Sequence, residues 1–381
     1  SKYTTFKIPY LCEELFMKLF KSLLVAPATL GLLAPLSAVA NEITVNDFNP
    51  VEEISNISPL LAGGEGLVDS HDGSFSETTA ASFSVDAVLG AIDGDATTEA
   101  TTFEYQFNIG LSTSFTGEDS LDIAIDSGSD AAATTDNPMA FDTGASLSVD
   151  GVAYSFPLGG ASMTVGNDTD ISASFTGACS YSAFTDYMGD CGTGNSLGVG
   201  GSGVTASGGY AFDAGFSLAG GSSGEATTVA SGSTVSNGLF TKEGSDIYGI
   251  EAAYTADSYG VAVAYVSNDG GTGAETTYWG VNATYSFDMF DVSVGYETEE
   301  KTVTETGYFV GLTFPEVGPG SVSVGAATLG NFTDDQTELM AYEASYSYPV
   351  NDSLTVTPGV FIEEKSGDDL TGVLVKTSFS F

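Results

Sequence analysis

The stretch FEYQFNIGLSTSF, residues 103–115, alternates apolar and polar side chains over most of its length. Its odd positions carry Phe, Tyr, Phe, Ile and Leu up to residue 111, and Phe again at residue 115. Its even positions carry Glu, Gln, Asn, Gly and Ser. Successive side chains of a strand point to opposite faces, so this stretch predicts a β-strand with one apolar face and one polar face.

The same alternation continues to the end of the chain. Residues 248–381 divide into nine such segments, and seven more lie near 80–91, 102–115, 120–127, 145–158, 161–166, 203–212 and 214–220. Short turns such as ND (351–352) alternate with longer polar loops such as NFTDDQTE (331–338). This is typical of antiparallel strands whose two ends face different compartments. We predict an all-β fold, a transmembrane antiparallel up-and-down β-barrel of about 16 strands.

A soluble β-sandwich also shows alternating strands, so it is the main alternative for the fold. Two features of the sequence favour the barrel. Aromatic residues stand at the ends of the apolar stripes, as in the pairs Tyr259/Tyr265 and Trp279/Phe287, where a membrane barrel places its interfacial girdles. The opposite face carries Gly, Ser, Thr, Asn and acidic residues throughout, which suits a water-filled lumen.

The chain before the barrel divides into three predicted parts. Residues 1–16 precede the first Met and resemble an upstream or non-native segment. Residues 17–40 predict a signal peptide with a basic start, an apolar core and an Ala38-Val39-Ala40 cleavage site. A membrane anchor is the alternative, but Pro27 and Pro35 interrupt its short core. Residues 41–77 are irregular, a possible plug or periplasmic stretch, and we expect the barrel at 78–381.

Charge excludes one class of partner. The chain has 51 Asp and Glu against 8 Lys and no Arg, for a formal net charge of −43. No basic patch is available to neutralise phosphates, so we expect no nucleic-acid partner. The single histidine, His71, and the acidic pairs lack the spacing of a metal site, and a serine-hydrolase site would need that one histidine to meet a nucleophile and an orienting acid. We expect no metal, no cofactor and no enzymatic activity.

Residues 167–202 show no strand pattern and are too long for an ordinary turn. We predict that they fold inward as a constriction loop, with a Cys179–Cys191 disulfide that restrains it. The alternative is a solvated extracellular loop with the same disulfide. The candidate rim carboxylates are Asp168, Asp170, Asp186 and Asp190, and the candidate aromatic walls are Tyr181 and Tyr187.

By alternation, a set of acidic residues faces the predicted lumen. They are Asp86, Glu104, Asp122, Asp126, Glu251, Asp291, Glu297, Glu343 and Glu363. Any one of them has the simpler interpretation of keeping a water-facing wall soluble. Together they predict an electronegative pore that favours cations and neutral solutes over anions.

Several segments resemble the outer-membrane porins of marine cyanobacteria. They are MKLFKSLLVAPATLGLLAP (17–35), STSFTGEDSL (112–121), VAYSFPLGGASMTVG (152–166), AYEASYSYPVNDSLTVTPGVFIEE (341–364) and GVLVKTSFSF (372–381). The resemblance implies a bacterial, cyanobacterial outer membrane, with outer-membrane lipid and lipopolysaccharide around the barrel. That family often carries a surface-layer-homology domain after the leader, and only residues 41–77 occupy its place here. Wall anchoring is therefore not carried over. Porin pores of this kind also commonly set basic residues against acidic ones, and this chain has no basic cluster.

The final segment, residues 372–381, predicts the closing strand. Val373, Val375, Phe379 and Phe381 would face lipid, and the strand would pair with the first strand near 80–91. A terminal Phe on such a stripe resembles the signal that the barrel-assembly machinery reads in this family. We hypothesise a general-diffusion or weakly selective porin for small hydrophilic solutes or ions, and a homotrimer at this size. The alternatives are a structural or adhesive barrel with an occluded pore and a secreted soluble β-protein.

Overall fold

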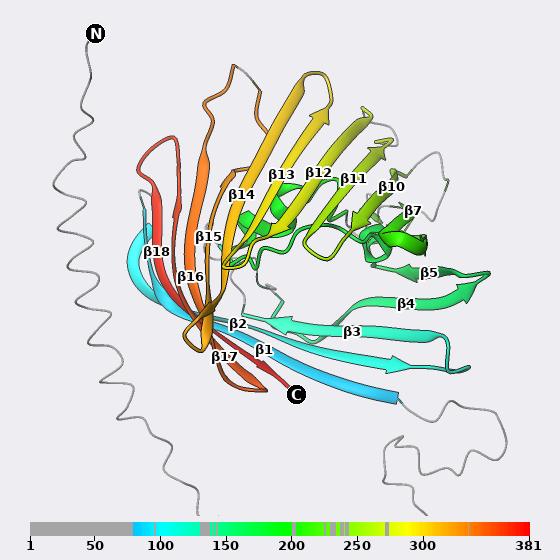
Figure 1. Cartoon of the computed structure of the whole chain (residues 1–381), viewed down its shortest axis with the longest axis horizontal. Helices are drawn as coiled ribbons and strands as arrows, with labels where there is room; N and C mark the ends of the chain where they lie inside the picture. Colours follow the sequence, from blue (N-terminus) through cyan, green and yellow to red (C-terminus); the bar gives the residue numbers. More distant parts are fainter. Residues whose placement is uncertain are drawn as a thin grey trace, which may run out of the picture. The chain divides into compact units, whose positions relative to one another are not determined.

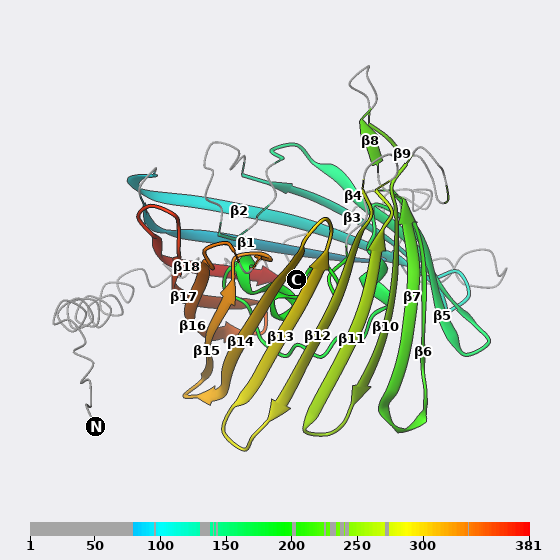
Figure 2. The same cartoon turned by 90° about the horizontal axis from the view of Figure 1, so that it is seen from above.

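The computed structural model describes residues 79–381 apart from short gaps at 95–96, 130–137, 140, 142–143, 200–202, 225, 229–233, 237–239, 241–243, 271–273 and 334. Within these residues, sixteen antiparallel strands form one closed barrel, and each strand pairs with its neighbours in chain order (Figures 1 and 2). The predicted upstream segment (1–16), signal peptide (17–40) and irregular segment (41–77) lie outside the described residues.

The barrel strands are β1 Thr79–Gly94, β2 Thr97–Thr113, β3 Ser120–Gly128, β4 Ser148–Leu158, β5 Ala161–Asn167, β6 Val204–Ala211, β7 Phe216–Gly224, β10 Asp246–Thr255, β11 Tyr259–Asn268, β12 Thr276–Ser286, β13 Asp291–Glu300, β14 Thr304–Val317, β15 Gly320–Thr328, β16 Met340–Asn351, β17 Leu354–Glu363 and β18 Leu370–Ser380. A separate hairpin of β8 Ala226–Thr228 and β9 Thr234–Ser236 stands in the connection between β7 and β10. The described helices, η4 Ile171–Ser174, η5 Asp186–Gly192 and η6 Asp213–Gly215, are short 3₁₀ turns. None of them is long and apolar enough to cross a membrane.

The predicted closure between the two ends of the barrel is confirmed. β18 pairs antiparallel with β1, with Phe379 opposite Val85. The Phe83 N–H donates to the Phe381 carbonyl at 2.8 Å, and the Phe381 N–H donates back at 3.0 Å. Their rings stack with centroids 5.9 Å apart. Phe381 is therefore part of the wall, and the sheet that forms the barrel has no open edge.

The apolar stripes face outward. On β11, Tyr259, Val261 and Val263 are 36–44% exposed, while the alternate residues Ala262 and Ala264 are at most 1% exposed. Trp279 on β12 and Val373 and Val375 on β18 are likewise exposed. A protein folded in water buries most of its large apolar side chains, whereas a membrane barrel presents them to lipid. The outer surface therefore has the pattern of a lipid-facing wall.

The connections differ in length at the two ends of the barrel. Short turns join β2 to β3, β4 to β5, β12 to β13 and β16 to β17 at one end, and both chain-terminal pairing residues, Phe83 and Phe381, lie at this end. The connections at the other end include the one between β3 and β4, whose described residues 138, 139 and 141 lie inside the barrel, and the one between β5 and β6, whose described residues 168–199 lie there too. The sequence did not predict the β8–β9 hairpin, because its strands are only three residues long.

Candidate constriction site

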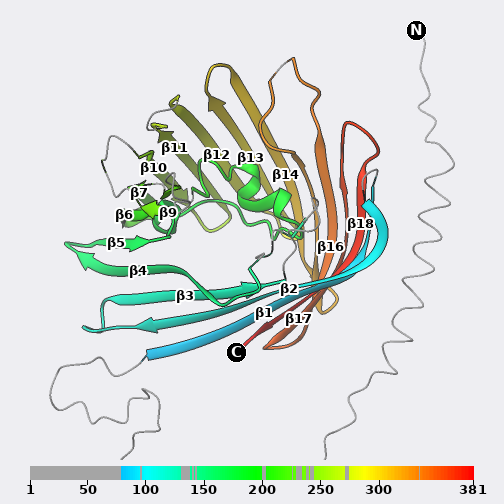
Figure 3. The same cartoon turned by 180° about the vertical axis from the view of Figure 1, so that it is seen from behind.

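The connection between β5 and β6, here called the inner loop (residues 168–199 as described), lies inside the barrel. In Figures 1 and 3 it is the green segment after β5, lying between the wall of β10–β14 and the opposite strands. Its outgoing limb, 171–187, and its returning limb, 188–199, lie against the inner face of β6–β17. This inward fold confirms the internal loop and excludes the extracellular alternative.

The outgoing limb is held first by β10 and β12. The backbone N–H groups of Thr176 and Gly177 donate to the two carboxylate oxygens of Glu251 at 2.7 and 2.9 Å. The Ala178 N–H then donates to Oδ1 of Asn282 at 2.7 Å. Glu251 and Asn282 are each 2% exposed. Buried acceptors of this kind fix the loop backbone because an unpaired partner on either side is costly.

Glu343 on β16 holds the tip of the loop with four donors. Its carboxylate accepts from the Tyr181 hydroxyl at 2.9 Å, the Phe184 N–H at 2.7 Å, the Thr185 N–H at 2.8 Å and the Thr185 hydroxyl at 2.6 Å. The Tyr181 ring also packs edge-on against Phe309, with centroids 5.0 Å apart. Burial of the phenol, together with the adjacent Glu343 charge, raises the pKa of Tyr181 above its ordinary value. Tyr181 therefore stays neutral and remains a donor.

The returning limb is tied to the outgoing limb and to β13. The sulfur atoms of Cys179 and Cys191 are 1.99 Å apart, which closes the disulfide that the sequence predicted. Ser196 donates to Glu297 through both its N–H and its hydroxyl at 2.8 Å, and Asn195 adds a third bond at 2.9 Å. Glu297 is 1% exposed.

The three glutamates Glu251, Glu297 and Glu343 stand on β10, β13 and β16, that is, on every third strand. Neighbouring strands are about 4.8 Å apart, so these acceptors repeat about every 14 Å around the wall. An extended chain rises about 3.4 Å per residue, so the roughly nine residues from Thr176 to Thr185 are long enough to bridge from the first acceptor to the last. The inner loop therefore crosses successive strands of the wall and does not run along a single strand. In this arrangement we also call the inner loop the strap.

Glycines on the inner face make room for the strap. An added Cβ at Gly295 would lie 1.7 Å from the Cys191 carbonyl oxygen, and one at Gly280 would lie 1.8 Å from Oγ of Ser196. Other inner-face glycines beneath loop side chains are Gly221, Gly249, Gly311, Gly325 and Gly359. The sequence contains this signal, a run of glycines on the polar face of consecutive strands, although the alternation alone predicts only a lumen wall there.

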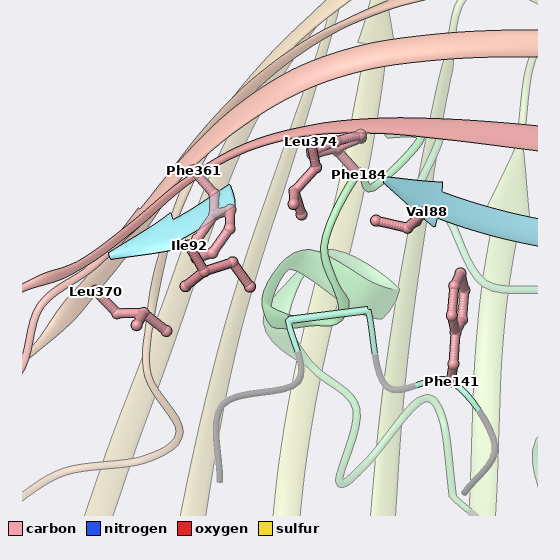
Figure 4. Close-up of a cluster of buried hydrophobic side chains, with 7 residues drawn as sticks. All are labelled: Val88, Ile92, Phe141, Phe184, Phe361, Leu370 and Leu374. Atoms are coloured by element: carbon pink, nitrogen blue, oxygen red, sulfur yellow. The ribbon is translucent and has the colours of Figure 1, made fainter. Parts of the chain in front are cut away.

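The tip of the loop joins an apolar cluster inside the barrel. Figure 4 shows the cluster, which consists of Val88, Ile92, Phe141, Phe184, Phe361, Leu370 and Leu374. Phe141 belongs to the connection between β3 and β4, and the Asp186 N–H donates to the carbonyl of Pro138 in that same connection at 2.8 Å. A second inward segment therefore meets the loop tip. The strand pattern gives no sign of this segment, although PMAF at 138–141 is an apolar group within the connection.

The wall of β1–β5 carries the polar inner face that the strap leaves uncovered. On it, Gln106 donates to Asn108, and Asn108 donates to Ser84, at 3.1 and 3.4 Å. Ser120 donates to Asp122 at 2.6 Å. Asp86 and Asp126 lie on the same face, where they accept from Ser378 and Ser148.

The predicted loop carboxylates lie on the strap. Asp168, Asp170 and Asp186 are exposed, and Asp190 lies at the rim of a small cavity within the loop. Burial of the Asp190 carboxyl, followed by repulsion from Asp186, raises its pKa above the ordinary value.

Two of the predicted roles need correction. Tyr181 does not form a wall of the opening, because it is 9% exposed and pinned to Glu343. The half-buried Tyr187 donates to Glu363 at 2.7 Å and packs toward Phe361, so it too holds the loop.

The nine predicted pore-lining acids all sit on the inner face but divide into two groups. Asp86, Glu104, Asp122 and Asp291 lie outside the strap and are partly exposed, and Asp126 also lies outside it but is only 7% exposed. Glu251, Glu297, Glu343 and Glu363 are at most 8% exposed, because the loop or the adjacent Lys365 covers them. These four do not line open water. The alternation of the sequence predicts that a side chain points to the inner face of the barrel, but it does not predict whether another segment of the chain covers that side chain.

Among the residues that the structure describes, no group of three or more His, Cys, Asp or Glu side chains is arranged to hold a metal ion.

The barrel is similar to solved bacterial outer-membrane proteins at low sequence identity. OprB of Pseudomonas putida, in a high-pH structure, superposes with a TM-score of 0.63 at 14% identity over 82% of this chain and 95% of that chain. OmpT, an outer membrane protein of Vibrio cholerae with loop L8 deleted, gives 0.57 at 11% identity over 80% and 99%. An anion-selective porin from Comamonas acidovorans gives 0.57 at 13% identity over 80% and 99%. No family model and no curated protein matches the sequence. The likeness is one of fold.

Proposed function

We propose that the protein is an outer-membrane porin through which small hydrophilic solutes and ions diffuse passively. The observation that carries this proposal is the closed sixteen-strand barrel with an apolar outer face and an uncovered polar wall on β1–β5. Barrels of this size are too wide for side chains to fill and leave an aqueous channel. The strapped loop narrows such a channel without a moving part, so transport needs no energy source and no cofactor. A channel also accounts for the barrel better than an enzyme does.

The charges on the inner face support a preference for cations. Asp86 and Asp122 face the uncovered side, and the strap adds exposed Asp168 and Asp170. Lys376, the one lysine within the described strands, shares the inner face of β18 with Leu374. The neighbour from Comamonas acidovorans is anion-selective, so this fold accommodates either sign of selectivity. The sign must come from the side chains, which act within about 8 Å at physiological ionic strength.

Reversal potentials in planar bilayers under a KCl gradient test this proposal. The refolded barrel should give stepwise ohmic currents. Its reversal potential should lie on the side of the K⁺ equilibrium potential, as expected for a pore that prefers cations. A double substitution Asp168→Asn and Asp170→Asn should move the reversal potential toward zero. An anion-side potential in the unmodified protein would overturn the proposed selectivity while leaving the porin proposal in place.

A structural or adhesive barrel with an occluded pore is the second candidate. The observation that favours it is the apolar cluster of Phe184, Phe141 and their wall partners, which fills part of the interior. The absence of conductance steps from correctly folded protein would decide for this candidate.

Origin and partners are part of the same proposal. The cyanobacterial porin family, the signal peptide, the lipopolysaccharide environment, assembly by the barrel-assembly machinery and a homotrimer rest on the sequence. The sixteen-strand barrel and its exposed terminal Phe381 support a protein of this kind.

A further inference from the structure

The connection between β15 and β16 reaches the same carboxylate as the inner loop. Nδ2 of Asn331 donates to Oε1 of Glu297 at 3.0 Å, and Nδ2 of Asn195, which belongs to the inner loop, donates to that same oxygen at 2.9 Å. The other oxygen of Glu297 accepts the N–H and the hydroxyl of Ser196. One carboxylate on β13, which is 1% exposed, therefore joins two segments that lie far apart in the chain.

The backbone of residues 329–333 directs Asn331 into the barrel. Phe332 exchanges two backbone hydrogen bonds with Thr306 of β14, at 2.8 and 2.9 Å, so the segment extends the sheet past the end of β15. The Phe332 ring packs edge-on against Tyr308 on the outer face, with centroids 6.3 Å apart. Successive side chains of an extended segment point to opposite faces, so Asn331 points to the inside.

A glycine leaves the space that this asparagine needs. Gly307 on β14 is the cross-strand partner of Glu297. A Cβ at Gly307 would lie 2.5 Å from Oδ1 of Asn331, so a larger residue would push the amide away from the carboxylate. Leu329 adds an apolar contact, because it packs against the buried cluster to which Cys191 of the returning limb belongs. The segment therefore contacts the structure beneath the inner loop through both a polar and an apolar side chain.

A second buried carboxylate requires the same donor. Glu299 is 6% exposed, and its Oε2 accepts from Nδ2 of Asn331 at 3.4 Å. Its Oε1 accepts from the Tyr278 hydroxyl at 3.1 Å and pairs with the Lys301 ammonium at 2.6 Å. An amide –NH₂ group has two hydrogens and can donate one to each of two carboxylates, whereas an aspartate at the same position would only add a third negative charge. Asparagine therefore suits the gap between Glu297 and Glu299.

We propose that Asn331 is a positioning residue for the constriction. It holds the Glu297 carboxylate in place, and through that carboxylate it seats the returning limb of the inner loop, residues 188–199. The constriction is then fixed by two connections of the barrel, the inner loop and the segment 329–333. The inference rests on the proposed porin function, and it identifies a residue outside the inner loop on which the shape of the opening depends.

Hydrogen exchange of the returning limb in detergent micelles tests this role. The amides of residues 193, 196 and 197 are hydrogen-bonded, so they report whether the limb is seated. In Asn331→Ala the Glu297 carboxylate loses one of its four donors, and peptides covering 193–197 should exchange about tenfold faster. Peptides covering 176–178, which Glu251 holds, should exchange as in the unmodified protein.

Asn331→Asp adds a readout that a loss of packing would not change. At neutral pH this variant puts a third carboxylate beside Glu297 and Glu299, so exchange at 193–197 should be at least as fast as in Asn331→Ala. The two neighbouring carboxylates raise the pKa of the introduced carboxyl, and its protonated form is again a donor to Glu297. Relative to the unmodified protein at each pH, protection should therefore return between about pH 8 and about pH 5. Absence of this recovery, or the same recovery in Asn331→Ala, would refute the direct bond.

Two further variants separate positioning from general loosening. Gly307→Ala keeps every charge and every polar group but displaces the Asn331 amide, and it should speed exchange at 193–197 as Asn331→Ala does. Asn351→Asp makes the same change as Asn331→Asp at an exposed position at the other end of the barrel, and it keeps the oxygen that accepts the Ser353 N–H. It should leave residues 193–197 unchanged. Faster exchange that stays confined to 329–333 in both Asn331→Ala and Gly307→Ala, or equal loss of protection at 176–178, would overturn the proposal.

Single-channel recording separates this inference from the proposed function. In a conducting pore, Asn331→Ala should raise the open-channel current noise, because a limb of the constriction loop moves more freely, whereas Asn351→Asp should not. Faster exchange at 193–197 in a barrel that never conducts supports the positioning role and refutes the porin proposal. A conducting pore whose Asn331→Ala variant shows unmodified exchange and unmodified noise refutes the positioning role and leaves the porin proposal standing.

Discussion

Replacement of Glu343 by glutamine should release the tip of the inner loop while the barrel stays closed. The carboxylate accepts four hydrogen bonds at 2.6–2.9 Å from Tyr181, Phe184 and Thr185. A glutamine keeps one acceptor oxygen but turns an N–H₂ group toward two of these donors. It is nearly the same size as glutamate, so the substitution changes the chemistry of the site without opening a cavity.

The magnitude follows from the two bonds that are lost. Hydrogen bonds to a charged acceptor contribute about 1.5–3 kcal/mol each, so loop docking weakens by at least about 3 kcal/mol. A local opening that is easier by about 3 kcal/mol exchanges its amide hydrogens about a hundredfold faster. The hydrogen bonds from the inner loop to Glu251 and Glu297 remain, so the effect should be confined to the tip of the loop.

Hydrogen exchange followed by mass spectrometry measures this directly in detergent micelles. Peptides covering residues 181–187 should exchange about a hundredfold faster in Glu343→Gln, while peptides from β16 stay protected. The control is Glu316→Gln, which makes the same charge change at an exposed position. Unchanged protection at residues 184–185 in Glu343→Gln, or equal loss in the control, would refute the view that this carboxylate anchors the loop.

Four further predictions concern the pore. Reduction of the Cys179–Cys191 disulfide, or its double replacement by serine, removes a restraint of about 3 kcal/mol on a loop of this length, and single-channel current noise should rise. Lys376→Gln removes a positive charge from the inner face of β18, so the reversal potential should move further to the cation side. Because burial and repulsion from Asp186 raise the pKa of Asp190, its charge disappears at a higher pH than that of an ordinary aspartate, so cation preference should begin to fall at a higher pH in the unmodified pore than in Asp190→Asn. Deletion of Phe381 should reduce the yield of inserted barrel more than the conductance of the barrels that form, and normal assembly would contradict that role.

Much of the fold was predictable because its determinants are local. The alternation in residues 103–115 and its repeats gave the strands, and the short turns gave their antiparallel order. The wall that the loop covers was not predictable in the same way. Glu251 and Asp122 are alike in sequence, since each is an acid on a polar face, yet one lies under the strap and the other beside it.

The difference depends on contacts between segments far apart in the chain. Glu343 meets Thr185 across 158 positions, and no local pattern announces such a pair. The role of Tyr181 is ambiguous in the sequence for the same reason, because an aromatic side chain in a long loop suits either a rim or an anchor. The inner-face glycines at 280 and 295 are the clue that the sequence contains. They mark positions where the inner loop packs so closely against the barrel wall that a side chain would not fit.

The positions of the loop's anchors in the sequence bear on how the barrel can assemble. The anchors of the inner loop on β10, β12, β13, β16 and β17 all come later in the sequence than the loop itself, by 74 to 176 positions. The loop can therefore complete its contacts only when these strands are in the sheet. Until then the growing barrel holds a wide and unguarded lumen. A barrel that inserts without completing these contacts would therefore be expected to leak.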